Sequence, residues 1–573
     1  MANRATARRK RKQQKSAKSA GSGRSVGGRY FMFLVLGLLL VAGVMARVQF
    51  LDRSLWLDEA WVANSIQASS LRDAIYYDDW LQTTPPLFIA LSRTVTEVFG
   101  TSNLAFRLLP AFFGILAIPL FAFIALRILK PGFAIIGMLL FISNPQLILY
   151  SQSLKQYSTD VFSTIALLIV GYLYLERRTD RWYYALLAGF VTCSFLSYPA
   201  MLFWPFLLYV AFVKTDLQYR TETEGIRSKL PQLVLVIVLG VSIFLINYLL
   251  FIAPNKNPAL AEFFREGFYE WHSYLEFIGF YGTRFSSLAE SFFFGRAGVL
   301  RVLTILIITV SLIHLWVSPI KMRRPGGLAM AVLLTAPIAA IMALNVIGVF
   351  PLPGFHHRLL LFVFPITALV FCLGLQFFAS ILARLIAPRV KTLTGVKAFA
   401  ATSVENVLGI FVAVMLAIPI LVFFTTVGVG PIFAEDHEEI EPAIGYLAQR
   451  MQPDDVLYIH ATMRQQLKLY GQTLPANKIV HGGIGAPCCP RNGYRDPGQE
   501  SVEDLYREVS VLSQAAAGRQ LWLVSTDRQL HWVHVQRNDV KLLERGLASW
   551  GCAKIEEARF KGVYIGRFGC QPQ

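Results

Sequence analysis

Long apolar runs separated by short polar stretches dominate the sequence between residues 30 and 430. The runs hold roughly 20 residues each, which is the length a helix needs to cross a hydrocarbon core of roughly 30 Å. We therefore predict a polytopic α-helical membrane protein with about eleven transmembrane helices. Residues 181–214 could instead form one long helix kinked at Pro199. The predicted spans are 30–49, 105–128, 132–150, 160–176, 181–197, 199–214, 231–252, 297–318, 327–349, 357–385 and 404–428.

The polar stretches between the runs predict the orientation. Five short connections each carry at least two basic residues, and such connections face the cytoplasm: "RILKPG", "ERRTDR", "KTDLQYRTETEGIRSK", "SPIKMRRPGG" and "ARLIAPRVKTLTGVK". The first external loop is then 50–104, and a long external loop is 253–296. Treating Thr84 to Gly100 as a span would reverse every later loop, so we predict an amphipathic or re-entrant helix there. The chain is thus expected to cross the plasma (inner) membrane many times, with its N-terminus in the cytoplasm.

The pattern changes after residue 430. "EDHEEIEPAIGYLAQRM" predicts a helix, "DDVLYIHA" and "RQLWLVSTD" predict buried strands, and "CAKIEEARFKGVYIGRFGC" predicts a hairpin. We therefore predict a soluble α/β domain over residues 431–573. The odd number of predicted spans places this domain on the extracytoplasmic side.

Four of the six cysteines lie in this C-terminal domain, where an oxidising compartment permits disulfides. Cys552 and Cys570 are equidistant from Lys561, so a hairpin that turns there would place them opposite each other. We prefer this pair, although Cys488 and Cys489 leave three full pairings open. No CxxC pattern is present, which argues against a zinc site.

Composition and charge agree with a membrane protein. Hydrophobic residues make up 55% of the chain and charged residues 16%, whereas a soluble protein carries about 25% charged residues. The net charge of +18 is concentrated at the start, because residues 1–29 hold ten basic residues and no acid. We predict a disordered cytoplasmic tail beside anionic membrane lipids. A nucleic-acid-binding tail is the alternative, which the adjoining hydrophobic span disfavours, so no nucleic-acid partner is expected.

Two acidic pairs lie in the first external loop. Asp58 and Glu59 stand in "SLWLDEAWVA", where a helix N-terminus would favour the ionised carboxylate that a general base requires. An interfacial helix flanked by tryptophans explains the same residues without catalysis. Asp78 and Asp79 in "YYDDWLQTTPPL" could return towards Asp58 or form a solvated turn.

Two further clusters lie at the predicted external edge of the membrane. "YSQSLKQYSTD" contains Lys155, Tyr157 and Asp160, and ionised groups at membrane level are costly unless they are paired or face a cavity. Snorkelling and helix capping are the alternative explanation.

The other cluster is "FHHRLLLF", with His356, His357 and Arg358. These cations could bind lipid phosphate or an anionic leaving group, or they could simply meet lipid headgroups. All four clusters fall on one side of the membrane in a topology drawn without reference to them. Their co-location predicts one shared site.

The order of these motifs resembles the GT-C glycosyltransferases that take a sugar from a polyprenyl-phosphate donor. Protein O-mannosyltransferases and bacterial aminoarabinose transferases are examples. Many relatives have His or another polar residue where this chain has Thr84, and an Arg is common where it has Lys155, which leaves metal use and donor contacts open. The matching segments, between about residues 30 and 370, are "DEAW", "TTPPLFIAL", "FRLLPAFFGIL", "LILYSQSLKQYSTD" and "HHRLLLFVFP".

The resemblance implies an inverting sugar transfer on the extracytoplasmic face, to a hydroxyl of a cell-envelope glycan, lipid or protein. Asp58 would be the general base, and Asp160, the second predicted catalytic residue, would help to form the site or bind a metal. Lys155 and Arg358 would neutralise the polyprenyl-phosphate leaving group. A divalent metal on Asp58 and Asp160 is an option, not a requirement, because phosphate is already a competent leaving group. The remaining predicted substrate-binding residues are Glu59, Asp78, Asp79, Tyr157, His356 and His357.

Glu59 is the weakest member of that set, because it lies about 100° further round a helix than Asp58 and need not share the site. Two other functions remain as alternatives. A transporter or flippase of lipid-linked sugars would need acids near the bilayer midplane and broken helices in repeated halves, whereas the charged residues here lie at the external rim. A non-catalytic assembly subunit could retain the scaffold, but the presence of Asp58 argues against it.

Overall fold

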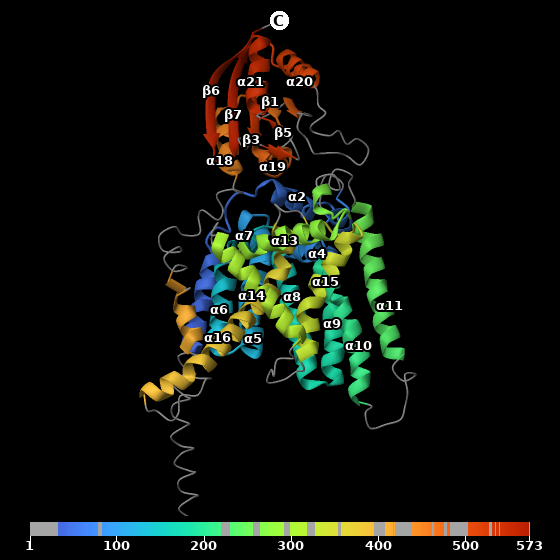
Figure 1. Ribbon diagram of the computed structural model, residues 1–573. Coiled ribbons are helices and arrows are strands. Elements are labelled where there is room, and N and C mark those ends of the chain that lie inside the picture. Colours follow the sequence, from blue (N-terminus) through green and yellow to red (C-terminus); the bar gives the residue numbers. More distant parts are fainter. Residues whose placement is uncertain are drawn as a thin grey trace, which may run out of the picture.

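The computed structural model places a helical bundle below a small mixed α/β domain (Figure 1). The described residues are 32–77, 83–218, 230–255, 264–290, 298–317, 327–352, 357–394, 407–415, 417–418, 438–460, 463–474, 478–481, 502–526, 530–532, 535–537 and 539–571. The basic tail 1–29 lies outside them.

The bundle follows the predicted apolar runs closely. Its first helix is Met32–Val48. The next members are α5 (Asn103–Ile128), α6 (Pro131–Ser143), α7 (Pro145–Ser151), α8 (Tyr157–Arg177), α9 (Asp180–Leu196), η1 (Tyr198–Phe203), α10 (Trp204–Gln218) and α11 (Leu230–Ile246). The chain continues through η3 (Asn247–Ile252), η4 (Ala253–Asn255), η5 (Arg265–Gly267), α13 (Tyr274–Glu290), α14 (Gly298–Val317), α15 (Gly327–Val346), η6 (His357–Val363) and α16 (Phe364–Thr394). Residues 407–415 and 417–418 are also helical.

Five helices in the described part of the chain are long and apolar enough to cross a membrane. They are Asn103–Ile128, Tyr157–Arg177, Leu230–Asn255, Gly327–Val346 and Arg358–Ile386. A sixth span is possible if α6 and α7 count as one, although they are bent by 53° at Asn144. Large apolar side chains also face outwards from the bundle, as expected for a surface in contact with lipid. The protein is therefore a multi-pass membrane protein, but the predicted count of about eleven is not confirmed.

Short helices and bends account for part of the difference between the predicted eleven spans and the five or six that are long enough. α9 has 17 residues, and the chain breaks after it at Ser197, where the backbone is extended. Two separate helices therefore replace the single kinked helix that was the alternative for 181–214. The last predicted span, 404–428, lies largely outside the described residues.

Three short helices follow the first span: α2 (Leu57–Ile66), α3 (Leu71–Ile75) and α4 (Pro86–Phe99). The diproline starts α4, where the missing amide donors cost nothing. With 14 residues α4 is too short to span a bilayer, as expected for the segment after Thr84. All three helices lie at the end of the bundle that faces the C-terminal domain (Figure 1).

The C-terminal part is a five-stranded sheet with helices on both faces. The strand order is β2-β1-β3-β7-β6; β1 is parallel to β2 and β3, and β7 is antiparallel to β3 and β6. The strands are β1 (Val456–Ile459), β2 (Lys478–His481), β3 (Gln520–Thr526), β6 (Cys552–Phe560) and β7 (Val563–Cys570), with a separate β4 (Leu530–Trp532) and β5 (Val535–Arg537) ribbon. The helices are α18 (Ile440–Arg450), α19 (Arg464–Tyr470), η9 (Gly471–Thr473), α20 (Val502–Ala515) and α21 (Asp539–Ser549).

Successive side chains of β1 pack into two different hydrophobic clusters, one on each face of the sheet. Val456 and Tyr458 pack into the cluster that includes residues of α20 and α21. Leu457 and Ile459 pack into the cluster that includes residues of α18 and α19. Successive side chains of a strand point to opposite faces, so one short apolar strand serves both layers. The predicted helix, both strands and the hairpin are all present.

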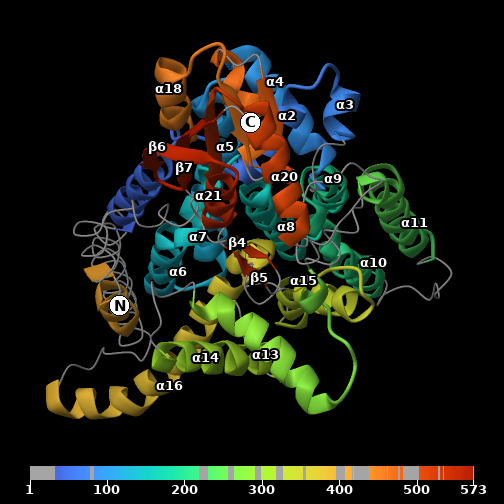
Figure 2. The same cartoon turned by 90° about the horizontal axis from the view of Figure 1, so that it is seen from above.

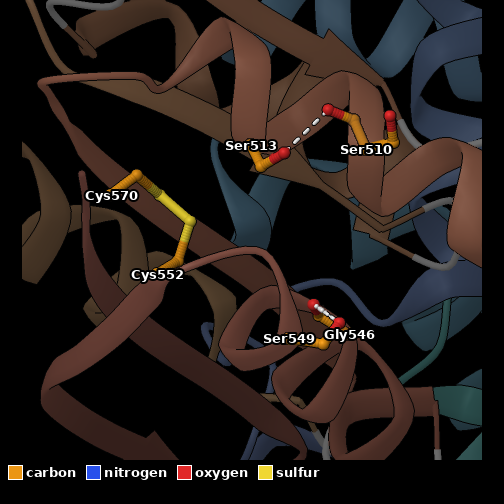
Figure 3. Close-up of a disulfide and its surroundings, with 6 residues drawn as sticks. All are labelled: Ser510, Ser513, Gly546, Ser549, Cys552 and Cys570. Carbon is orange, nitrogen blue, oxygen red and sulfur yellow. Dashed lines mark hydrogen bonds between the residues drawn. A yellow bond between two sulfur atoms is a disulfide. The ribbon is translucent and has the colours of Figure 1, made fainter. Parts of the chain in front are cut away.

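A disulfide joins Cys552 to Cys570 across the ends of the hairpin (Figure 3). These two residues are direct partners in the register of β6 and β7. The turn falls at Lys561 and Gly562, where Gly562 has a positive φ of 72° that glycine adopts without steric cost. The pairing is the one that the hairpin geometry favoured. Cys488 and Cys489 lie outside the described residues.

Candidate functional site

The first turn of α2 carries both acids of the "DEAW" motif. The helix begins after Trp56, and the amide of Glu59 donates to the carbonyl oxygen of Trp56 at 2.9 Å. Asp58 and Glu59 therefore stand where the exposed amides at a helix N-terminus favour negative charge. The two side chains then diverge in direction and have different partners.

Glu59 is fully buried and forms a two-pronged ion pair with Arg107 of α5. Nε and Nη2 of Arg107 lie 2.8 and 2.6 Å from the two carboxylate oxygens. Burial raises the pKa of Glu59, but Arg107 more than offsets this effect and leaves the pKa below its usual value. The amide of Leu154 also donates to Glu59 at 2.6 Å. With no exposed surface, Glu59 has a structural role in this geometry, and the geometry gives no support to its prediction as a substrate-binding residue.

Arg107 extends this anchor to the chain before α2. Its guanidinium donates to the backbone carbonyls of Leu51, Arg53 and Ser54. One arginine thus fixes the connection from the first span, the start of α2 and, through Glu59, the segment that carries Lys155. Arg107 lies within the motif "FRLLPAFFGIL", and no role was predicted for it from the sequence. A lone arginine that opens an otherwise apolar span was the available signal.

Asp58 faces two cations from distant parts of the chain. Its Oδ2 atom lies 2.9 Å from Nη1 of Arg358 and 3.9 Å from Nζ of Lys155. The Asp58 side chain is 11% exposed, whereas the Lys155 side chain is completely buried. Three ionised groups would leave one positive charge in this cluster. The site is therefore poised to attract an anion.

Lys155 lies in the short connection between α7 and α8. Burial is the largest influence on its ammonium group and lowers its pKa to about 7, with Asp58 opposing that change and Arg358 adding to it. Gln152 holds the start of this connection, since its side chain accepts from the Phe50 amide at 2.9 Å and donates to the Ala46 carbonyl at 2.7 Å. These hydrogen bonds tie the start of the connection that carries Lys155 to the end of the first helix and the residues that follow it.

Tyr157 and Asp160 line the first turn of α8 beside this cluster. The hydroxyl of Tyr157 is within electrostatic reach of Arg358, Asp58 and Asp160. Its ring packs edge-to-face on Tyr150, with ring centroids 4.7 Å apart. The structure therefore brings four predicted residues to one place, namely Asp58, Lys155, Tyr157 and Arg358, with Asp160 next to them.

Asp160 belongs to a buried polar strip. Ser197, at the end of α9, lies beside it, and Thr164 is one turn further along α8. Oδ1 of Asp160 and the hydroxyls of Thr164 and Thr84 are buried without a hydrogen-bond partner among the described residues. Tyr198 donates to the Thr84 carbonyl at 3.2 Å, which connects the strip to the start of α4. Buried polar atoms of this kind are normally satisfied by water or by a ligand.

The other predicted site residues are not described. Asp78, Asp79 and His356 lie outside the described residues, and only the backbone of His357 is described, at the start of η6. Within the described ranges, no three His, Cys, Asp or Glu side chains gather closely enough to hold a metal ion. Among the described residues, Asp58 and Asp160 are the predicted catalytic acids at this place, and both cations next to Asp58 would compete with a metal for it.

Comparisons with known proteins give a distant structural likeness. No protein-family model matches the sequence, and no curated protein matches it. The chain is similar to ArnT from Cupriavidus metallidurans in the apo state, with 14% identity, a TM-score of 0.48, and 94% of this chain and 98% of that chain covered. It is also similar to the same protein bound to undecaprenyl phosphate, with 15% identity, a TM-score of 0.45 and the same coverage.

Proposed function

We propose that this protein is a membrane glycosyltransferase that moves a sugar from a polyprenyl-phosphate donor to an acceptor hydroxyl. The reaction would take place on the extracytoplasmic face of the plasma membrane. The acceptor would be a cell-envelope glycan, lipid or protein. The observation that carries the proposal is the Asp58 cluster, in which one carboxylate lies against the cations Arg358 and Lys155. The motif resemblance described above supports the same reading.

The cluster suits a single displacement at the anomeric carbon. Asp58 takes the proton of the acceptor hydroxyl, and the acceptor oxygen forms the new bond to carbon. The bond from that carbon to the phosphate oxygen breaks, and its electron pair leaves with the polyprenyl phosphate. Attack opposite to the leaving group inverts the configuration. An ion pair stabilises the ionised carboxylate, which is the form that a base requires.

Arg358 and Lys155 would act on the leaving group. A phosphodiester carries one negative charge, and the departing phosphate monoester gains a second as the bond breaks. Fixed cations in a water-poor site stabilise that developing charge and thereby lower the barrier. Without donor, Asp58 is their counter-ion; with donor, the phosphate offers them a second anion.

Asp160 and the polar strip are our candidates for the sugar side of the donor. Oδ1 of Asp160 and the hydroxyls of Thr164 and Thr84 lack partners among the described residues, and a sugar offers a dense set of hydroxyl donors. A divalent metal remains an optional partner of Asp58 and Asp160 in this proposal.

The first test is Asp58→Asn in the purified full-length protein, assayed for release of sugar from a polyprenyl-phosphate-sugar donor. The amide cannot accept the proton, so we expect turnover to fall by at least about 1,000-fold. Asp73→Asn is the matched control, because Asp73 is an exposed acid in the same external loop that bonds only to nearby serines in the described structure. Full turnover by Asp58→Asn would refute its role as base.

A wild-type protein that transfers no sugar from any polyprenyl-phosphate donor, while moving such a lipid across vesicles, would favour the flippase alternative. Loss of transfer in Asp73→Asn as well would point to general damage of the loop.

A further inference from the structure

The C-terminal domain docks directly on the helix that carries Asp58. α19 packs against α2, and the carboxamide of Asn64 donates to both the backbone and the side-chain oxygen of Gln465, at 2.9 and 2.8 Å. Both residues are buried. The domain therefore reaches the last part of α2 through buried hydrogen bonds, not through a loose surface contact.

Tyr470 holds the other end of α2. Its hydroxyl accepts from the amide of Leu55 at 2.9 Å and donates to the side chain of Asn103. Leu55 lies three residues before Asp58, and its side chain is in the apolar cluster against which Tyr470 packs. The Tyr470 ring thus fills the junction while its hydroxyl fixes the backbone that leads into α2.

Glu441 closes the junction on the same side. Its carboxylate accepts from Asn103 at 2.7 Å, and its amide donates to Ser54 at 3.3 Å. Asn103 is the first residue of α5, one turn before Arg107. The docking contacts therefore meet the Arg107–Glu59 anchor, so α2 is held from the bundle and from the C-terminal domain at once.

We infer that the C-terminal domain positions Asp58 for the reaction, with Tyr470 and Asn64–Gln465 as its positioning contacts. This inference rests on the proposed function for the meaning of Asp58. The domain is then a part of the catalytic structure, not only a tethered module for the acceptor. Rates are sensitive to such support, because displacement of a reacting group by about 1 Å can cost roughly 100-fold.

The test is Tyr470→Phe in the full-length protein, which keeps the ring and removes only the hydroxyl. Tyr564→Phe is the matched control, because Tyr564 is also buried in this domain and its hydroxyl bonds to Glu544, far from α2. We expect kcat to fall about tenfold in Tyr470→Phe, with the KM for donor unchanged within about twofold. A merely structural loss would lower the thermal midpoints of both variants alike and leave kcat unchanged.

Hydrogen exchange supplies a readout that does not depend on activity. Amides of residues 55–66 should exchange faster in Tyr470→Phe than in wild type and Tyr564→Phe, because Leu55 loses its acceptor. If kcat and exchange in Tyr470→Phe both match the control, the inference is wrong. If the wild type itself transfers no sugar, the proposed function fails, and exchange at residues 55–66 alone decides whether the domain holds α2.

Discussion

Lys155 ties the charge of the site to pH. Its ammonium group is buried beside Asp58, and burial lowers its pKa to about 7. Below that pH the site holds the full complement of cations, and above it Lys155 becomes neutral. The stability of the fold changes in the opposite direction. Between pH 7 and 10.5 the unfolded chain binds a proton at Lys155 that the folded chain does not, so the free energy of unfolding rises with pH in this range.

For wild type we predict that kcat/KM for the donor falls as pH rises above about 7, because the free protein then loses a phosphate-binding charge. Lys155→Met keeps a long unbranched side chain without charge and should lower kcat/KM about 100-fold at pH 6. The difference between the two proteins should shrink to about tenfold at pH 8 and about twofold at pH 9. Steady-state assays of both proteins across pH 6–9 would measure this change. A ratio of kcat/KM between wild type and Lys155→Met that stays constant with pH would contradict the prediction.

Single residues were predictable from the sequence when their chemistry was out of place. Asp58, Lys155 and Arg358 stood out because ionised groups at a membrane edge need partners, and the structure makes them partners of one another. The different surroundings of Asp58 and Glu59 were only partly predictable from the sequence. Spacing predicted that they diverge, but nothing in the sequence showed that Arg107, 48 residues later, would bury Glu59.

At the scale of elements, apolar runs predicted where helices lie better than how they end. Asn144 accepts from the amide of Leu147 and starts a new helix at Pro145, so one apolar run became the bent pair of α6 and α7. Because hydropathy is averaged over a window of residues, it does not reveal a break of this kind within an apolar run. The C-terminal strands were easier to predict, because a short apolar run bounded by polar residues is a local signal.

Helices α5 and α7 pack closely together at Gly114 and Ser151. A methyl group on Gly114 would lie 2.4 Å from Cβ of Ser151, so Gly114→Ala must push α7 and the adjoining Lys155 segment away from α5. We expect it to destabilise the fold by about 1–3 kcal/mol and to lower donor turnover about tenfold. Thermal unfolding in detergent and the transfer assay would measure both effects.

Gly37→Ala is the control for this change, because Gly37 lies in the first helix with no atom within 4 Å of the added methyl group. It should keep wild-type turnover and gain slightly in helix stability. A Gly114→Ala protein as stable and active as Gly37→Ala would show that the contact is not tight.

At the scale of the whole molecule, the C-terminal domain covers one part of the bundle and leaves α11, α13 and α14 uncovered (Figure 2). α5 and α8 run side by side away from the site, and Arg127 near the far end of α5 pairs with Glu176 of α8 at 3.3 Å. From the basic connections, the sequence predicted that this end of α5 and α8 lies opposite the end that carries the site. It could not predict which face of the domain docks on α2, because that contact joins segments about 400 residues apart.

The orientation in the membrane has its own test. In a Cys488→Ser, Cys489→Ser background, a membrane-impermeant maleimide added to intact cells should label exposed cysteines at positions 69 and 548 (Ser69→Cys, Ala548→Cys). It should label Thr179→Cys, between α8 and α9 at the opposite end, only after permeabilisation. The basis is the positive-inside distribution of the connections. Labelling of Thr179→Cys in intact cells would overturn the proposed orientation.

The docking of α19 on α2 also constrains the order in which the protein can be completed. α2 leaves the ribosome early, yet Leu55 must wait for Tyr470, which follows it by 415 residues. The hairpin closed by Cys552 and Cys570 is synthesised later still. Contacts of such long separation form slowly, because the intervening chain must be ordered first. If the C-terminal domain positions Asp58 as inferred, a chain that has not yet made this domain has its acid in place without that support, and activity should appear only after the domain has been synthesised and docked.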